Sequence, residues 1–239
     1  MITIYCLVYN EELLIQFMIS YYRSRFSNCK IIFFDNSSTD NTVEIAKNNG
    51  CEIRTYNSNN TLDDGLHMQI KNSCWKDAET DWVLVCDLDE LLDITEQDLK
   101  NEEVLGTTII RPETWHMINM EDNYDFINIK WGYRDTNDPS YDKDLLFNKK
   151  YVEEINYGAG CHNHNPGPPT GLVKYTDNIY KLYHYKYINE DLEVFKNKLT
   201  KERLSEANKQ NNWGIQCLRT EEGIRIDFAG KRRRAIKLF

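Results

Sequence analysis

The chain lacks several features that would place it in other classes of protein. No apolar stretch among its 239 residues approaches the roughly 18 consecutive residues of a membrane-spanning helix, so we expect a soluble protein with no membrane span. No basic leader precedes the apolar run at residues 2–8, which is typical of a first strand and not of a signal peptide. The formal net charge is −9. This charge argues against binding to nucleic acid, which needs a basic surface.

Cysteine and glycine patterns exclude further classes. No two cysteines are separated by two residues, and the seven cysteines are scattered along the chain. Several stand inside apolar runs, where cysteine behaves as a small hydrophobic residue. This usage indicates a reducing compartment, and we expect the protein to be cytoplasmic. The segment after the first apolar run, Val8-Tyr9-Asn10-Glu11, contains no glycine, although a dinucleotide- or methyl-donor-binding enzyme needs a glycine-rich turn there.

The first ninety residues alternate between strand and helix patterns. Asn10 and the capping-box spacing from Asn41 to Glu44 predict two helix starts, and Gly50 predicts a helix end. Consecutive strand–helix units with short connections predict an α/β fold, with a mostly parallel central sheet flanked by helices. Four apolar runs are the predicted strands of this sheet: residues 2–8, 30–35, 51–56 and 81–86.

Beyond residue 105 the pattern is weaker. Residues 119–141 and 158–171 are expected to form long loops, and such loops over strand ends often act as lids or acceptor sites. Residues 190–208 predict a charged amphipathic helix. Three further strands are predicted at residues 107–111, 143–147 and 182–185.

Polar clusters follow three of the predicted strands. They are Tyr9-Asn10-Glu11, Asp35-Asn36-Ser37-Ser38 and Asp87-Leu88-Asp89-Glu90. Ligands of open α/β sheets bind outside the carboxyl ends of the strands, so we expect these clusters to converge on one edge. Asp87 and Asp89 can both reach one hard cation, Mn²⁺ or Mg²⁺, which would bridge two phosphate oxygens. The alternative is that these acids only begin a turn and cap the next helix.

The three clusters also resemble a known family. Val8-Tyr9-Asn10-Glu11, Asp35-Asn36-Ser37-Ser38-Thr39-Asp40 and Asp87-Leu88-Asp89-Glu90 are similar in order and separation to the motifs of a family 2 glycosyltransferase of the GT-A fold. The resemblance covers residues 1–95, and past residue 110 only Lys181-Leu182-Tyr183-His184-Tyr185 resembles a family element. It implies a Rossmann-like half for nucleotide-sugar and metal at residues 1–105, an acceptor-binding half at residues 106–210, and a C-terminal tail or linker at residues 211–239.

The resemblance implies a metal-dependent enzyme that transfers a sugar from a nucleoside-diphosphate sugar to a hydroxyl group, on a glycan or another acceptor. Tyr9 would stack on the nucleobase, and Asp35 would accept a hydrogen bond from the base or the ribose. This pair matches the N–H edge of uracil or thymine, so we expect a UDP- or dTDP-linked hexose or deoxyhexose donor. Asn10 and Glu11 would complete this site. The alternatives are a core position for Tyr9 and a turn cap for Asp35.

The resemblance also implies the residues around the diphosphate. Asp87 would bind sugar or ribose hydroxyls, and Asp89 would ligate the metal. His184 would be a third metal ligand or a diphosphate contact, and the alternative is a core histidine. Lys71 stands where related enzymes often place a basic residue, although it could be a solvated helix residue.

An inverting transferase needs a general base to take the proton of the acceptor hydroxyl. The candidates are Glu113 and Asp142, with Asp144 as a further carboxylate, and the sequence does not choose between them. Glu113 is favoured slightly because Trp115 and His116 beside it resemble a sugar-stacking platform.

Other functions explain less of the sequence. A non-catalytic carbohydrate-binding module accounts for the many aromatic residues but not for three acidic strand ends. A degenerate transferase is a further alternative. A phosphatase with a DxD motif requires Thr or Val where Leu91 stands. Cys161, His162 and His164 are spaced too tightly for a usual structural zinc site.

Overall fold

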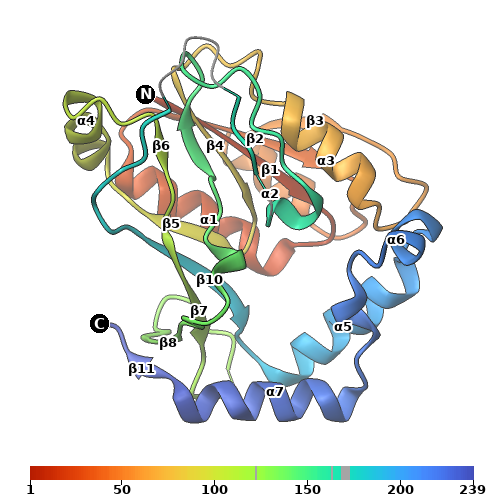
Figure 1. Cartoon of the computed structure of the whole chain (residues 1–239). Coiled ribbons are helices and arrows are strands. Elements are labelled where there is room, and N and C mark those ends of the chain that lie inside the picture. Colours follow the sequence, from red (N-terminus) through yellow and green to blue (C-terminus); the bar gives the residue numbers. More distant parts are fainter. Residues whose placement is uncertain (122, 163, 168–172) are drawn as a thin grey trace.

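The computed structural model describes residues 1–121, 123–162, 164–167 and 173–239, and it contains two β-sheets with helices packed around them (Figure 1). The first sheet has the strand order β3-β2-β1-β4-β9-β6. Its strands are β1 (Ile2–Val8), β2 (Cys29–Asp35), β3 (Glu52–Thr55), β4 (Trp82–Asp87), β6 (Ile109–Ile110) and β9 (Leu146–Asn148). The second has the order β11-β8-β7-β10-β5. Its strands are β5 (Glu90–Asp93), β7 (Glu113–Ile118), β8 (Trp131–Tyr133), β10 (Lys181–Tyr187) and β11 (Ile236–Lys237).

The predicted α/β fold is confirmed in the first sheet. β1 pairs in parallel with β2 and with β4, and β2 pairs in parallel with β3. β9 pairs antiparallel with both β4 and β6, so the sheet is mixed. The helices are α1 (Glu12–Arg25), α2 (Thr42–Asn48), α3 (Asp64–Ser73), α4 (Glu96–Val104), α5 (Glu190–Arg203), α6 (Glu206–Asn211) and α7 (Glu221–Arg234).

Both faces of the first sheet are buried, as continuous apolar strands require. Ile2, Ile4 and Cys6 of β1 belong to the core cluster that contains the buried face of α1. Tyr5 points to the opposite face, where it packs with Trp75 after α3. The helices therefore cover the sheet as two outer layers.

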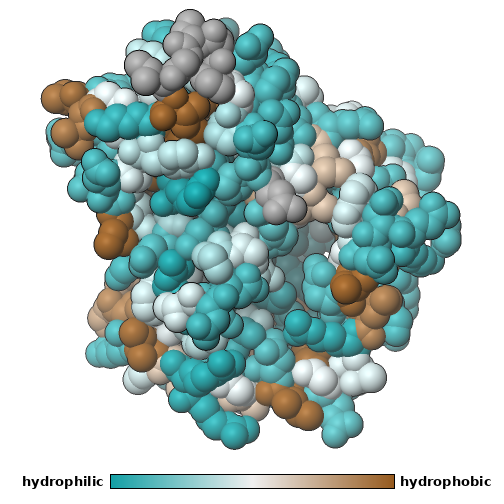
Figure 2. Space-filling model, in the orientation of Figure 1, coloured by the Kyte–Doolittle hydropathy of each residue, from teal (hydrophilic) through white to brown (hydrophobic). Residues whose placement is uncertain are grey.

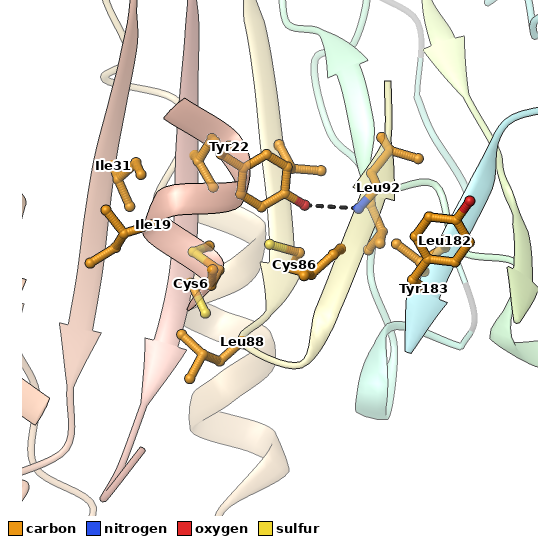
Figure 3. Packing of buried hydrophobic residues seen from close by; sticks show 14 of the residues in the cluster. Cys6, Ile19, Tyr22, Ile31, Cys86, Leu88, Leu92, Leu182 and Tyr183 are labelled. Carbon is orange, nitrogen blue, oxygen red and sulfur yellow. Dashed lines mark hydrogen bonds between the residues drawn. The ribbon is translucent and has the colours of Figure 1, made fainter. Parts of the chain in front are cut away.

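One buried tyrosine connects the first core to the second sheet. The hydroxyl of Tyr22 on α1 accepts a hydrogen bond of 3.0 Å from the backbone N–H of Leu92 in β5, as Figure 3 shows. Leu92 and Leu182 of neighbouring strands β5 and β10 lie in the same cluster (Figure 3). This packing fixes the second sheet against the end of β4.

Both predicted helices form, but Asn10 is not the cap of the first, and Asn41 stands at the start of the second without a capping hydrogen bond. Asn10 has a left-handed φ of 52° and lies outside α1, and its side chain accepts a hydrogen bond from the backbone of Thr39. Asn41 is the N-cap residue of α2, as predicted, but its side chain makes no capping bond, and its amide group donates to Glu12. Gly50 follows α2 with a φ of 65°, which confirms the predicted helix end.

The second half departs further from the sequence expectations. The expected loop at residues 119–141 contains β8 and a 3₁₀ turn, η1 (Pro139–Tyr141). The expected loop at residues 158–171 contains the 3₁₀ turn η2 (Ala159–Cys161), and part of it lies outside the described residues. The predicted helix 190–208 is divided at Leu204, where the backbone is extended and Ser205 caps α6.

Residues 211–239, expected to form a tail or linker, contain the 3₁₀ turn η3 (Ile215–Leu218), α7 and β11. Phe228 of α7 is fully buried in a cluster with Ile118 of β7 and Tyr187 of β10. β11 pairs antiparallel with β8. This segment is therefore part of the second sheet and its core.

The surface is mainly polar on the face that Figure 2 shows, where hydrophobic residues form small separate groups. Among the described residues, no helix combines the length and the apolar character needed to cross a membrane.

Candidate active site

The three polar clusters converge on one edge of the first sheet, as expected. In the parallel register, Asp35 at the end of β2 stands opposite Val8 of β1, and Asp87 at the end of β4 stands opposite Leu7. Tyr9 follows directly after β1. The carboxyl ends of three neighbouring strands thus bring these side chains to the same edge.

Asp87 is held by two buried lysines. Lys71 Nζ on α3 lies 2.6 Å from Asp87 Oδ1, and Lys143 Nζ lies 3.4 Å from Asp87 Oδ2. Burial raises the pKa of Asp87, but the charges of Lys71 and Lys143 outweigh burial and hold the pKa below its usual range. Asp87 is therefore an ionised carboxylate. Lys71 is not a solvated helix residue, because it is buried against this carboxylate.

Lys143 is a site residue that sequence reasoning missed. Its ammonium also lies 2.6 Å from Glu90 Oε1, and Glu90 accepts a hydrogen bond from the backbone N–H of Asp87. Burial lowers the pKa of Lys143, but the charges of Glu90 and Asp87 raise it above its ordinary value. Two cations and two anions therefore lie together under the DxD turn. No local pattern around Lys143 marks it, since its partners are more than fifty positions away in the sequence.

A cavity of about 220 Å³ opens beside Asp87. Its walls come from α3, from η2 and from Leu62 before α3. His67 lines it and exchanges a hydrogen bond of 3.1 Å with the hydroxyl of Tyr56. Burial, followed by the charge of Lys71, lowers the pKa of His67 to about 4, so the ring is neutral near pH 7. The cavity thus combines one neutral ring with the charged Lys71–Asp87 pair.

Asp89 has a different partner from Asp87. The turn between β4 and β5 places Asp89 Oδ2 3.3 Å from His184 Nε2 on β10. Burial raises the pKa of Asp89, but the charge and hydrogen bond of His184 outweigh it and hold the pKa below the usual range. His184 Nδ1 in turn lies 3.1 Å from His116 Nδ1 on β7. Burial, followed by the charge of His184, lowers the pKa of His116, which favours a neutral ring at this position.

Few side chains at this edge are placed to ligate a divalent cation. The described residues contain no cluster of three or more His, Cys, Asp or Glu side chains placed to hold a metal ion. Asp89 and His184 nevertheless form a pair 3.3 Å apart, a separation at which both atoms can ligate one ion. A carboxylate and an imidazole suit Mn²⁺, and phosphate oxygens would complete the shell. The pair therefore fits a cation that binds together with a diphosphate.

Tyr9 and Asp35 lie at the sheet edge with protein partners. The guanidinium of Arg203, at the end of α5, lies 3.4 Å from the centre of the Tyr9 ring. The half-buried ring is thus already a stacking surface, and it is not a core residue. Asp35 accepts hydrogen bonds of 3.2 and 3.3 Å from the backbone N–H of Ser38, which is the turn-capping arrangement considered from the sequence.

Glu11 connects the first strand end to α5. Its carboxylate lies 2.8 Å from Lys196 Nζ. Burial raises the pKa of Glu11, and the charge of Lys196 acts in the opposite direction. Sequence reasoning missed Lys196, which lies 185 positions away from Glu11.

The two predicted base residues gather around Arg134. Asp142 receives two hydrogen bonds of 2.8 Å from this guanidinium and a third from the backbone N–H of Thr114. Glu113 is 3.6 Å from Arg134, and its side chain is 40% exposed. Glu113 lies three positions before His116 along β7, which places it about 10 Å from the His116 level of the sheet.

Cys161, His162 and His164 have separate environments. His162 Nδ1 is 2.9 Å from the carbonyl oxygen of Ser140, whereas His164 Nδ1 is 2.8 Å from Asp144 Oδ2. Cys161 lines the cavity beside Asp87. The three side chains therefore contact different parts of the structure.

Comparisons with known proteins agree with the motifs. Residues 3–96 match the family described as "Glycosyl transferase family 2", which confirms the resemblance that the three clusters predict. The structure is accordingly an α/β fold of the GT-A type. No curated protein sequence matches the chain significantly.

Solved structures similar to this chain have low sequence identity to it. TarS 1-349 of S. aureus, in complex with UDP, has a TM-score of 0.49 and 12% identity over 90% of this chain and 73% of that chain. The mannosyltransferase PcManGT from Pyrobaculum calidifontis, in complex with GDP-Man and Mn2+, has a TM-score of 0.43 and 12% identity over 82% of this chain and 61% of that chain. Glucosyl-3-phosphoglycerate synthase from Mycobacterium tuberculosis, in complex with phosphoglyceric acid, has a TM-score of 0.34 and 15% identity over 48% and 43% of the two chains.

Proposed function

We propose that this protein is a metal-dependent glycosyltransferase that moves a hexosyl or deoxyhexosyl group from a UDP- or dTDP-linked donor to a hydroxyl acceptor, such as a glycan. One observation carries the proposal. At the carboxyl edge of the sheet, a carboxylate–imidazole pair, Asp89 and His184, lies beside the buried Lys71–Asp87 ion pair. The family match over residues 3–96 supports a transferase whose donor is a nucleotide-sugar.

The nucleoside would occupy the edge formed by Tyr9, Asp35 and the cavity beside Asp87. Tyr9 offers a ring face on which the nucleobase can stack, either after the Arg203 guanidinium moves away or with the guanidinium still in contact with the ring. Asp35 has its two oxygens on the backbone of Ser38 and could accept a further hydrogen bond from a base N–H. Asp87 would accept hydrogen bonds from ribose or sugar hydroxyls, and Asn10 and Glu11 shape the loop around them.

The diphosphate would lie between two kinds of positive charge. Asp89 and His184 would hold Mn²⁺ or Mg²⁺, which would neutralise the negative charge of the departing nucleoside diphosphate. Lys71 would supply a second charge on the α3 side, where it already lies in the cavity wall. We also propose a cytoplasmic location, since the seven cysteines are free thiols. Glu113 and Asp142 stay predicted candidates for the general base.

Thermal unfolding with MnCl₂ and a panel of nucleoside diphosphates tests this function. A ligand that binds only the folded protein stabilises it by mass action, so UDP or dTDP with Mn²⁺ should raise the melting temperature. A carbohydrate-binding module would not respond to any nucleotide, and that result would overturn the proposal.

Competition between nucleotides tests which nucleobase the site recognises. UDP and dTDP should displace a fluorescent UDP analogue at lower concentration than GDP or ADP, because a mismatched base leaves Asp35 without its donor. In the Asp35→Asn variant this preference should weaken. If GDP or ADP competes best with the wild-type protein, the role of Asp35 is wrong.

A further inference from the structure

A second cavity, of about 200 Å³, lies beside Asp89 and shares no lining residue with the cavity beside Asp87. It is lined by the end of β10, by α5 and by η3, which come from the part of the chain beyond residue 180. Asp89 and His184 form one wall, and Glu193 and Lys196 of α5 form another. The cavity therefore adjoins the carboxylate–imidazole pair, whereas Lys71 and Asp87 line the other cavity.

Glu193 is the carboxylate of this second wall. Its side chain is 16% exposed, and within the described part of the chain its one ionic contact is Lys186 Nζ, at 3.9 Å. That distance is beyond hydrogen-bond range, and no hydrogen bond to the Glu193 carboxylate is found among the described residues. The group is thus shielded from bulk water, yet it keeps its acceptor capacity for a molecule in the cavity.

The position of Glu193 is fixed from both ends of its helix segment. Asn189 caps α5 by accepting a hydrogen bond of 3.0 Å from the backbone N–H of Leu192. Lys196 lies on the same helix face as Glu193, three positions later, and its ion pair with Glu11 ties this face to the end of β1. The helix therefore holds Glu193 toward the site without using its carboxylate as the anchor.

The two general-base candidates from the sequence, Glu113 and Asp142, are placed less well than Glu193 to accept a proton in this cavity. Asp142 already accepts three hydrogen bonds, two of them from Arg134, so its oxygens are engaged. Glu113 is half-buried and lies beside the same guanidinium. Neither residue lines the cavity at Asp89.

We propose that this cavity receives the acceptor hydroxyl group and that Glu193 is the general base of the transfer, an inference that rests on the proposed function. The acceptor oxygen forms a bond to the anomeric carbon of the donor sugar while its proton passes to the Glu193 carboxylate. The bond from the anomeric carbon to the diphosphate oxygen breaks, and its electron pair leaves on the nucleoside diphosphate. The proton on Glu193 is later released to water, which restores the carboxylate.

The electrostatic environment is consistent with this role. Burial raises the pKa of Glu193, whereas the charges of Lys186 and His184 lower it, and the balance is a pKa above the ordinary value. A carboxylate with a raised pKa is a stronger base for a hydroxyl proton, as Brønsted behaviour requires.

Donor hydrolysis provides a test that needs no identified acceptor. Release of the nucleoside diphosphate, UDP or dTDP, is measured for UDP-glucose, UDP-N-acetylglucosamine and dTDP-glucose with MnCl₂, with water as the acceptor. In the Glu193→Gln variant, release from the donor that the wild-type enzyme uses should fall by roughly 10²-fold or more. The dissociation constant for UDP with Mn²⁺ should stay within about threefold of wild type, because the base acts only on the acceptor side.

Sodium azide separates a base from a structural role. The azide anion carries no proton, so it needs no base, and glycosyl azide formation by Glu193→Gln should approach the wild-type rate. Glu202→Gln, an exposed position on the same helix, is the matched control and should leave both rates unchanged.

Two results would overturn the assignment of Glu193 but not the proposed function. The first is hydrolysis by Glu193→Gln close to the wild-type rate, and the second is a loss of azide transfer as large as the loss of hydrolysis. The second result would mean that Glu193 only maintains the shape of the site. If the wild-type protein binds no nucleotide and releases none from any donor, the proposed function fails, and the role of Glu193 fails with it.

Discussion

His184 Nε2 on β10 lies 3.3 Å from Asp89 Oδ2 in the turn between β4 and β5. The antiparallel pairing of β5 with β10 sets this distance, because His184 stands opposite Glu90, the residue next to Asp89. A carboxylate from the first half of the chain thereby meets an imidazole from the second half. The cation site that the DxD motif predicts therefore depends on both sheets.

Asp89→Asn should abolish most of the metal-dependent affinity for UDP. The amide is a weaker ligand for a hard cation than the carboxylate is, and it removes one negative charge from the site. We expect the dissociation constant of UDP in the presence of Mn²⁺ to rise by more than about 100-fold, measured by calorimetry. Asp93→Asn, at the other end of β5, is the control. Unchanged affinity in the Asp89 variant would remove the basis of the proposed metal site.

His116→Phe should weaken metal binding without contact to the metal. Two Nδ1 atoms face each other at 3.1 Å, so one ring donates and the other accepts. For His184 to present the Nε2 lone pair to a cation, its Nδ1 must donate to His116. Loss of this acceptor should lower the affinity for Mn²⁺, titrated with UDP present, by about 10- to 100-fold. Affinity for UDP without metal should not change, and a loss there instead would indicate a general disruption of the site.

Asp144 should make the free energy of unfolding decrease at acidic pH. Its buried carboxylate accepts hydrogen bonds from Arg111 and Tyr175 and pairs with His164. Burial raises the pKa of Asp144, but the hydrogen bonds from His164 and Arg111 outweigh it, so the folded pKa lies below the ordinary value. A lowered folded pKa gives stability that is fully present above the unfolded pKa of about 3.9 and is lost as the pH falls through the folded pKa.

Urea unfolding of the Asp144→Asn variant at several pH values tests this direction of the pH dependence of stability. The variant should lose at least about 1.5 kcal/mol of unfolding free energy at pH 7, since hydrogen bonds to a charged group are lost. The difference from wild type should shrink as the pH falls below about 4. Asp81→Asn, which removes an exposed pair with Lys150, should cost less than about 1 kcal/mol at any pH. A constant difference for Asp144→Asn across pH would contradict the assignment.

Phe228→Ala tests whether the C-terminal segment is part of the folded core. Phe228 is fully buried between Ile118 and Tyr187, so truncation removes apolar contacts and leaves a cavity. The free energy of unfolding should fall by about 3–5 kcal/mol in one cooperative transition. Ile226→Ala, an exposed position on the same helix, should change it by less than about 0.5 kcal/mol. A small effect of Phe228→Ala would restore the view of residues 211–239 as a tail.

The sequence alone determined the four parallel strands of the first sheet and the position of their ligand edge. The continuous apolar runs of β1, β2 and β4 have a local signature, and parallel strands bring their carboxyl ends to one edge whatever follows in the chain. For the same reason Tyr9, Asp35 and Asp87 could be identified from the residues that follow each strand. Hydrophobic periodicity is a local property of the sequence, so it was sufficient to locate these strands and the residues that follow them.

Only the tertiary structure decided which side chains surround these acids. β8 and β11 have three and two residues, too few for a periodic pattern, and they pair with strands that lie far away in the sequence. Lys143 and Lys196 look like ordinary charged residues of a strand end and of an amphipathic helix. Their roles arise because folding buries them beside Asp87 and Glu11, where the loss of hydration makes an opposite charge necessary. Ion pairs of this kind depend on the topology that joins distant segments, and that topology is not encoded in any single window of the sequence.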